Sequence, residues 1–213
     1  MIACLSLYAE NYEPLAEKTL FENRLQYCRK HGYASLFRKY DVHFDSSFKL
    51  ACYLGFKKIE MILEAMEVVK DVPYVWFADC DAMIMNMGIQ IEAITKEYPQ
   101  DILIGSDCNG SSCGSMIIKN TDTAKTYLQT ILNTRDAYLH EQDFIWKNLR
   151  DFVFAVPQRV MNSWDCTLPY LQPPPDQLEK AQFQSGDFLI HWPSQTLEKR
   201  LECYEKYKGQ VIA

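Results

Sequence analysis

Apolar residues along the chain follow two different periods, one typical of buried strands and one typical of helices. Short runs rich in β-branched and aromatic residues predict strands at 2–7, 34–40, 74–78, 102–106, 115–119, 152–156 and 188–192. Apolar residues also recur every three or four positions, which predicts helices through 15–27, 57–70, 124–131, 141–149 and 197–204. Strands that alternate with helices are typical of crossover units. We therefore expect an α/β fold.

Two stretches of the chain show neither period. The segment 107–114 is rich in Gly, Ser and Asn, and we expect a loop there that either lines a hydroxyl-rich ligand or is an ordinary hairpin turn. The segment 158–185 contains Pro169 and three consecutive prolines at 173–175. We interpret it as an irregular excursion of one domain, because long loops inside compact domains are commonly functional.

Two carboxylates follow directly after the run at 74–78. This run is apolar without alternation, which suits a central strand covered on both faces. In open α/β sheets, ligands bind at the carboxyl ends of such strands. Asp79 and Asp81, separated by Cys80, can converge on one divalent cation where the chain turns. The alternative is a solvated acidic turn.

Other candidate residues lie further along the chain. His191 ends an apolar strand, and as a neutral imidazole it would favour Mn²⁺ over Mg²⁺ if it met the carboxylates; it is otherwise a packed core histidine. Gly186 would let the backbone approach a phosphate. Gln142 and Asp143 form an acidic cluster with Glu141 that suits catalysis near a sugar, or that simply complements a helix dipole.

Composition excludes several classes of protein. Hydrophobic residues make up 48% and charged residues 23% of the 213 positions, so the chain folds rather than remaining disordered. A formal charge of −6 argues against nucleic acid as a partner. No apolar run is long enough to span a membrane, and residues 1–4 do not begin a signal peptide. We expect a soluble protein of the cytoplasm, the host-cell cytoplasm if the chain is viral.

The length and the cysteines bear on domain organisation. The chain has about 1.4 times the length of a typical domain, and a site that joins Asp79 and Asp81 to His191 favours one domain over residues 1–213. That domain is either complete or cut from a longer polypeptide. Eight cysteines without a Cys-x-x-Cys spacing predict mostly reduced, buried thiols, with one or two disulfides as the alternative.

Residues 74–86 resemble the strand and Asp-x-Asp-Ala motif of nucleotide-sugar glycosyltransferases of the GT-A fold. More narrowly, they are similar to family 34, which contains galactosyl-, mannosyl- and xylosyltransferases. The similarity continues in the family's order through 113–120, 141–143, 156–164 and 186–192. The chain also resembles a compact glycosyltransferase domain encoded by a large algal virus, which leaves open that it is that domain. The resemblance implies a GT-A fold with a Rossmann-like, mostly parallel central sheet flanked by helices.

The resemblance also implies roles for individual residues. Asp79 and Asp81 match the residues that hold Mn²⁺, with Mg²⁺ as the alternative ion, against the donor diphosphate, and His191 completes the metal site. Lys58 would touch the phosphates, and Gln142 and Asp143 would lie beside the transferred sugar. By analogy of fold, the end of the first strand would bind uracil and ribose through Ser6, Leu7 and Tyr8, with Arg38 and Asp41 as further candidates.

The implied activity is Mn²⁺-dependent transfer of a sugar from a UDP-sugar to a glycan or glycoprotein acceptor, with retention of configuration. The donor would be of the UDP-glucose, UDP-galactose, UDP-xylose or UDP-rhamnose type. One alternative is a metal-dependent sugar-nucleotide hydrolase or phosphoesterase acting through the same carboxylates. The other is a carbohydrate-binding module without catalytic activity.

Overall fold

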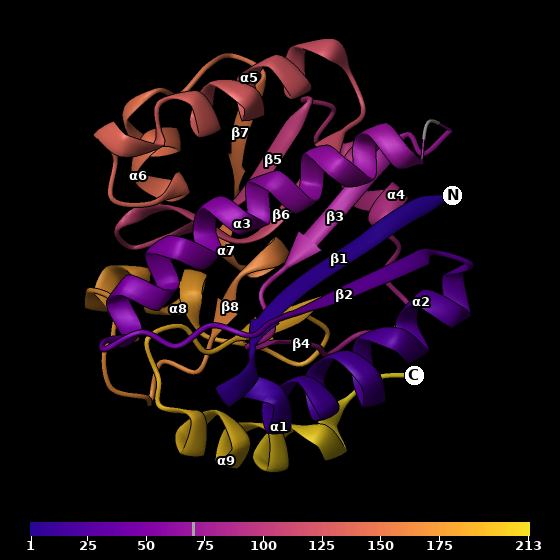
Figure 1. The fold of residues 1–213 in the computed structure, drawn as a ribbon. Coiled ribbons are helices and arrows are strands. Elements are labelled where there is room, and N and C mark those ends of the chain that lie inside the picture. Colours follow the sequence, from indigo (N-terminus) through magenta and orange to yellow (C-terminus); the bar gives the residue numbers. More distant parts are fainter. Residues whose placement is uncertain (70) are drawn as a thin grey trace.

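Six of the predicted strands form one sheet. The computed structural model describes residues 1–69 and 71–213, and its larger sheet has the order β2-β1-β3-β6-β5-β7 (Figure 1). The strands are β1 (Ile2–Ala9), β2 (Ala34–Tyr40), β3 (Tyr74–Ala78), β5 (Ile102–Asp107), β6 (Gly110–Lys119) and β7 (Val153–Val156). All neighbours are parallel except for β6, which is antiparallel to β3 and to β5. The predicted α/β fold with a mostly parallel sheet is confirmed.

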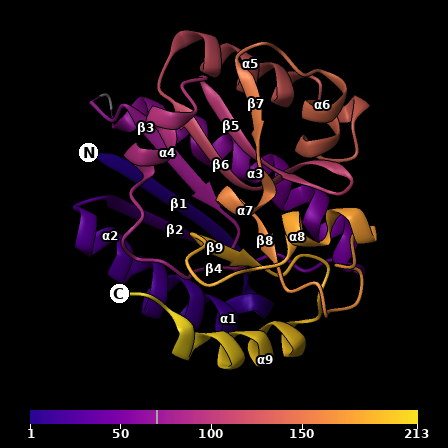
Figure 2. The same cartoon turned by 180° about the vertical axis from the view of Figure 1, so that it is seen from behind.

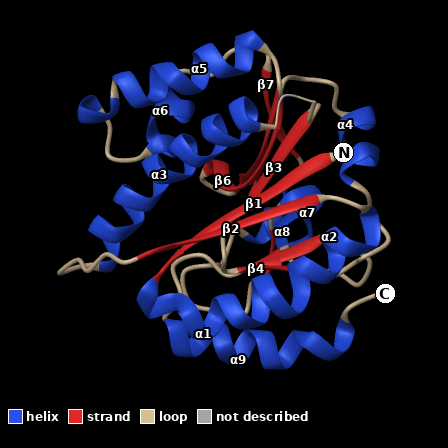
Figure 3. Cartoon of the chain, turned by 45° about the vertical axis from the view of Figure 1, so that its right-hand side comes forward, coloured by secondary structure: helices blue, strands red, loops and turns tan. Residues whose placement is uncertain are grey.

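Helices cover both faces of this sheet (Figure 3). Alternate residues of a strand point to opposite faces, and accordingly Val75 and Phe77 of β3 pack in one core while Trp76 and Ala78 pack in another. The first core lies under α3 (Ser47–Val68), α5 (Asp122–Asn133) and α6 (Glu141–Lys147). The second lies under α2 (Leu25–His31), α4 (Ile91–Glu97) and α7 (Gln158–Met161). The sheet is therefore the middle layer of three.

A second, three-stranded sheet brings distant segments together. Its order is β4-β9-β8, from β4 (Ala82–Ile84), β9 (Leu189–His191) and β8 (Ser163–Trp164), and it is visible from behind in Figure 2. Antiparallel pairing of β4 with β9 sets His191 opposite Ala82. Because Ala82 directly follows the turn after β3, this pairing carries His191 to the carboxylates. Helix α9 (Leu197–Tyr207) contributes Cys203, Tyr204 and Tyr207 to the core beside this sheet.

The first helical stretch is not a regular α-helix. It consists of α1 (Glu13–Ala16), a π-helical segment (Glu17–Arg24) and α2. Gly32 ends it in the left-handed conformation with a φ of 67°, which glycine adopts without steric cost. The sequence predicted a helix here but not its π-helical middle.

Several predicted boundaries were wrong. Helix α3 begins ten residues before the predicted start, because the hydroxyl of Ser46 accepts a hydrogen bond from the N–H of Lys49 and caps it. Residue 70, its predicted end, lies outside the described residues. The expected loop at 107–114 is mostly strand, since β6 begins at Gly110. The segment 158–185 contains α7, β8 and α8 (Leu178–Ala181), and neither α4 nor β4 was predicted.

The cysteine prediction is confirmed, since all eight cysteines lie among the described residues and all are free thiols. Among the helices of the described residues, none combines the length and the apolar character that a membrane span needs.

Candidate active site

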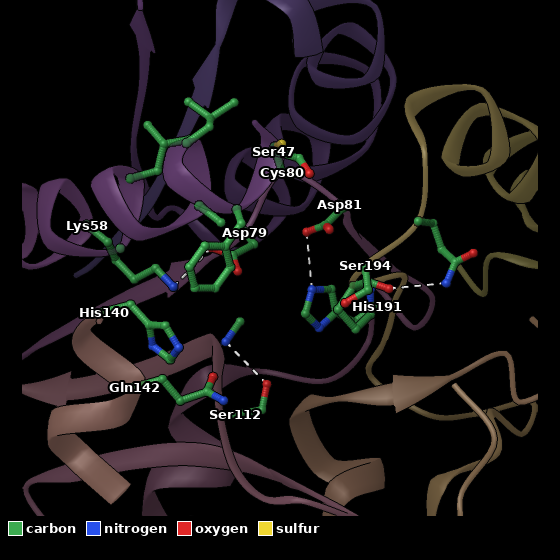
Figure 4. Close-up of a pocket in the computed structure, with 18 of the residues that line it drawn as sticks. Ser47, Lys58, Asp79, Cys80, Asp81, Ser112, His140, Gln142, His191 and Ser194 are labelled. Carbon is green, nitrogen blue, oxygen red and sulfur yellow. Dashed lines mark hydrogen bonds and ion pairs between the residues drawn. The ribbon is translucent and has the colours of Figure 1, made fainter. Parts of the chain in front are cut away.

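A cavity of about 630 Å³ opens at the carboxyl ends of β1 and β3. Its wall combines the end of β1, the turn after β3, the N-terminal half of α3, the start of α6, and the end of β9. Side chains from these segments face one common space (Figure 4). The position is the one expected for a ligand site in an α/β sheet, because the first strands end there side by side.

Asp79, Asp81 and His191 converge at this cavity. Each offers one ligand atom, and the three atoms lie within 4.8 Å of one another. The Nε2 atom of His191 lies 3.2 Å from Oδ1 of Asp81 (Figure 4). The predicted grouping of two carboxylates with this histidine is therefore present in the structure.

The hydrogen bonds of His191 indicate which ring nitrogen faces the carboxylates. Its Nδ1 lies 2.8 Å from Oδ1 of Asn162, whose amide nitrogen donates to the carbonyl of Ser106. Trp164 donates to the same Asn162 oxygen, so this oxygen is an acceptor and Nδ1 of His191 carries the proton. In the neutral ring, Nε2 then presents its lone pair to Asp81. Two acceptors that face each other fit a site that holds a cation between them.

Asp81 is also paired with a cation from the C-terminal helix. Nη2 of Arg200 lies 2.7 Å from Oδ2 of Asp81, and Nε of Arg200 donates to the carbonyl of Trp192. Burial alone would raise the pKa of Asp81, but the guanidinium of Arg200 holds that pKa well below its usual range. One oxygen of Asp81 is thus fixed by Arg200, and the other faces His191.

Lys58 is buried between three acceptors. Its ammonium lies 3.2 Å from Oδ1 of Asp79, 2.9 Å from Oε1 of Glu141 and 2.8 Å from the carbonyl oxygen of Cys113. Burial favours loss of its proton, but the two carboxylates outweigh this effect and raise the pKa of Lys58. Two of its three N–H donors form hydrogen bonds, to Glu141 and to the carbonyl of Cys113, and the contact with Asp79 is an ion pair. In this arrangement Lys58 holds Asp79 in place, and the expected contact with phosphate stays a prediction.

Two glycines permit close approaches in the site. A Cβ atom on Gly55 would lie 1.9 Å from Oε2 of Glu141, so the helix α3 can receive this carboxylate only at a glycine. A Cβ atom on Gly114 would lie 2.3 Å from Cε1 of His191. The carbonyl of Gly114 also accepts the N–H of Asp79 at 2.8 Å. Gly114 therefore lies between Asp79 and His191, and the structure leaves no room there for a larger residue.

The two candidates on α6 lie in different places. Gln142 lines the cavity, and its Oε1 accepts a hydrogen bond from the N–H of Cys113 at 3.0 Å. Asp143 is not among the described residues that line the cavity. Its carboxylate lies 2.8 Å from the ammonium of Lys147, one helical turn away. The structure brings Gln142 to the site but not Asp143.

The expected nucleotide-binding residues of β1 are divided in the same way. Leu7 and Tyr8 line the cavity beside the Asp-x-Asp turn. Ser6 is fully buried behind them, where its hydroxyl donates to the carbonyl of Ala78 and accepts from Arg24. Ser6 thus supports the turn from behind and is not among the described cavity-lining residues.

Three other residues that were predicted to contact the donor lie away from the cavity. Arg38 on β2 forms an ion pair with Glu64 at 2.7 Å. Asp41 follows the same strand and is exposed. Gly186 has a φ of 102°, and its carbonyl accepts a hydrogen bond from Asn86 in the turn that precedes β9. None of the three is among the described residues that line the cavity.

Sequence reasoning missed three residues that contact the site. Asn162 lies within a segment that resembles family 34, yet nothing in its local pattern indicated a bond to His191. Arg200 follows His191 by nine positions on a helix, and Glu141 was noted only as a neighbour of Gln142. Their roles depend on contacts across the fold, which one sequence does not display.

Comparisons with known proteins relate this chain to sugar transferases. The model of the galactosyl transferase GMA12/MNN10 family matches residues 5–97, which include the second half of β1, all of α3 and the Asp-x-Asp turn. A probable alpha-1,2-galactosyltransferase, gmh1 of Schizosaccharomyces pombe, is 24% identical over 90% of this chain and 67% of its own length. The probable alpha-1,6-mannosyltransferase MNN10 of Saccharomyces cerevisiae is 22% identical over 60% of this chain. The chain spans 67% of the first of these relatives and 38% of the second.

Solved structures share the fold at low sequence identity. A glycosyltransferase involved in glycosylation of the major capsid of PBCV-1 matches 96% of this chain and 98% of its own, with a TM-score of 0.74 and 14% identity. The galactosyltransferase LgtC, solved with donor and acceptor sugar analogues, matches 98% of this chain and all of its own, with a TM-score of 0.53 and 11% identity. The chain and the PBCV-1 protein are therefore different proteins. The GT-A fold and the similarity to glycosyltransferases of family 34 are confirmed.

Proposed function

We propose that this chain transfers a sugar from a UDP-sugar donor to a carbohydrate acceptor in a reaction that depends on a divalent metal ion. The observation that carries the proposal is the convergence of Asp79, Asp81 and the Nε2 lone pair of His191 at the carboxyl edge of the central sheet. The similarity to galactosyl- and mannosyltransferases supports the choice of sugar transfer over other metal-dependent reactions.

Two carboxylates and one imidazole would hold the ion. This donor set suits Mn²⁺ and accepts Mg²⁺ less well, because imidazole is a poor ligand for the harder ion. When bound, the ion would supply Lewis-acid stabilisation of the negative charge on departing UDP. Lys58 would hold Asp79 in place, and Arg200 would hold Asp81 in place and ionised.

Arg200 is the cation that we assign to the donor diphosphate. It lines the cavity beside Asp81, and a guanidinium carries five N–H donors, more than Asp81 and the Trp192 carbonyl occupy. Its planar shape suits two oxygens of a phosphate at once. Leu7 and Tyr8 would contact the nucleoside on the same side of the cavity.

Gln142 is our candidate for the residue beside the transferred sugar. Its carbonyl oxygen is held by the N–H of Cys113, which leaves its amide nitrogen as a donor toward a sugar hydroxyl. We extend the proposal to retention of configuration, with Gln142 near the anomeric carbon. Asp143 would have to leave Lys147 and turn toward the cavity to share this role.

The proposed donors are UDP-glucose, UDP-galactose, UDP-xylose and UDP-rhamnose, and the proposed acceptor is a glycan or a glycoprotein. These sugars differ by one or two polar groups, which a pocket distinguishes through hydrogen bonds. We further propose that residues 1–213 act as a single catalytic domain and that the reaction takes place in the cytoplasm.

The experiment is a panel of UDP-sugars incubated with the chain and Mn²⁺, with release of UDP measured with and without acceptor sugars. We expect one donor to give UDP release that rises strongly when acceptor is added and stops with EDTA. Asp79→Asn should abolish it, whereas Asp136→Asn, at an exposed position away from the cavity, should not. Equal release without acceptor would indicate a hydrolase, and glycan binding indifferent to UDP and Mn²⁺ would indicate a binding module.

A further inference from the structure

The backbone of the metal-binding turn is held from behind by side chains of another helix. Arg24 donates to the carbonyls of Ala78 at 2.7 Å, Asp79 at 2.9 Å and Ala82 at 2.7 Å. Thr19 donates to the carbonyl of Cys80 at 2.5 Å. Together, these two residues bind four carbonyl groups between positions 78 and 82.

A third residue of the same helix fixes the strand that follows the turn. Asn23 donates to the carbonyl of Ile84 at 3.0 Å and accepts the N–H of Ile84 at 2.8 Å. The one carbonyl of the turn that these residues do not reach is that of Asp81, which accepts the N–H of Trp192. Thr19 or Arg24 therefore binds four of the five carbonyls from Ala78 to Ala82, all but that of Asp81.

The cation in this arrangement has no carboxylate partner. Arg24 is fully buried, and within the described residues it forms no ion pair with an acidic side chain. It lies instead over the ring of Trp76, with 5.7 Å between the guanidinium carbon and the ring centroid. Burying a charge without a counter-charge is costly, and carbonyl dipoles offset that cost only when several of them converge. The convergence of the turn's carbonyls on Arg24 provides this compensation.

The π-helical geometry makes the arrangement possible. Asn23 and Arg24 follow Thr19 by four and five positions, and all three residues lie within the π-helical segment. In a regular α-helix, Thr19 and Arg24 would point about 140° apart, because successive residues turn by about 100°. The wider i→i+5 turn of a π-helix brings positions four and five apart onto one face, and such segments are frequent at functional sites.

We propose that Thr19, Asn23 and Arg24 form a carbonyl clamp that positions Asp79 and Asp81 for metal binding. The proposal rests on the proposed metal site, and it assigns the clamp as a set of positioning residues that act through the backbone of the turn. With its carbonyls fixed, the turn holds both carboxylates in the convergent geometry before the ion arrives. Removing one of these hydrogen bonds would therefore weaken metal binding. The loss of metal affinity would exceed the loss expected from the accompanying change in the free energy of unfolding.

The test measures binding of Mn²⁺ alone by electron paramagnetic resonance of the free ion. Thr19→Val is the mild variant, because it keeps the shape of the side chain and removes the hydroxyl that lies 2.5 Å from the carbonyl oxygen of Cys80 and 3.0 Å from that of Leu15. We expect Mn²⁺ affinity to fall about 10- to 100-fold, the range typical of lost contacts that orient metal ligands. Arg24→Lys, whose single nitrogen cannot occupy the positions of both Nη1 and Nη2, should lower it at least as far.

Tyr27→Phe is the matched control. Tyr27 lies on the same helical stretch and donates to the carbonyl of Ile89, outside the metal-binding turn. We expect this variant to lose stability without losing Mn²⁺ affinity. Thr19→Val with wild-type Mn²⁺ affinity would overturn the clamp, as would an equal loss of affinity in Tyr27→Phe. Absence of Mn²⁺ binding in the wild-type chain would instead refute the proposed metal site.

Discussion

Replacing Gly114 by alanine tests whether His191 is a metal ligand held in a fixed position. The added Cβ would lie 2.3 Å from Cε1 of His191 and 2.8 Å from its Nδ1. Ordinary contacts begin at 3.4 Å, so the ring or the strand must move by about 1.1 Å. The ring has no free direction, because it is buried and its Nδ1 is tied to Asn162.

A movement of this size is large for a metal site. Ligand distances are held to within about 0.2 Å in a working site, so a displacement of about 1.1 Å removes Nε2 from the coordination shell. We expect Mn²⁺ affinity to fall at least tenfold, about 1.4 kcal/mol. Overpacking a rigid site also lowers the free energy of unfolding by about 1–3 kcal/mol.

The assay compares Gly114→Ala with Gly209→Ala. A Cβ atom on Gly209 would meet no heavy atom within 4 Å, so that variant should bind Mn²⁺ and unfold like the wild type. Mn²⁺ titration by paramagnetic resonance and urea unfolding of the three proteins give both quantities. Unchanged Mn²⁺ affinity in Gly114→Ala, with normal folding, would refute the role of His191 as a ligand in a rigid position.

Four further substitutions test the charges around the site. Lys58→Met leaves Glu141 and Asp79 without their buried partner and should lower the free energy of unfolding by about 3–5 kcal/mol in urea, whereas Glu141→Gln should cost less because Lys58 keeps Asp79. Arg200→Gln should weaken UDP binding at least tenfold in calorimetry while uridine binding changes little. The pKa of Asp81 is lowered in the folded state, so its stabilising contribution is present above about pH 4 and is lost as the pH falls. Asp81→Asn should therefore flatten the acid side of the stability profile, and an unchanged profile would contradict the pairing with Arg200.

The sequence predicted the central strands of the fold because the patterns that indicate them are local. The bounds of β2 and β3 match the predicted runs, and the two carboxylates follow β3 directly. Strands of two or three residues, such as β4 and β8, carry too few positions for a period to be recognised. The pairing that delivers His191 to Asp81 was therefore predicted only through the resemblance to family 34.

Gln142 and Asp143 are neighbours in the sequence and were both predicted to act at the site, but their side chains point in different directions. Successive residues of a helix point about 100° apart, so three consecutive side chains cannot all face the same space. Glu141 and Gln142 line the cavity from the first turn of α6, whereas Asp143 turns toward Lys147. The sequence predicted this helix, but it did not predict which side of the helix faces the cavity, because packing against the core sets that orientation.

Charge balance would link metal binding to donor binding in the proposed site. The side chains joined to the candidate ligands by ion pairs comprise three carboxylates, Asp79, Asp81 and Glu141, and two cations, Lys58 and Arg200. With a neutral imidazole, this cluster carries one net negative charge and repels a diphosphate. A divalent ion reverses the sign to one net positive charge, which attracts it. We infer that the fixed cations hold the carboxylates in place but do not suffice to bind UDP, so that the metal ion and the diphosphate stabilise each other in the cavity.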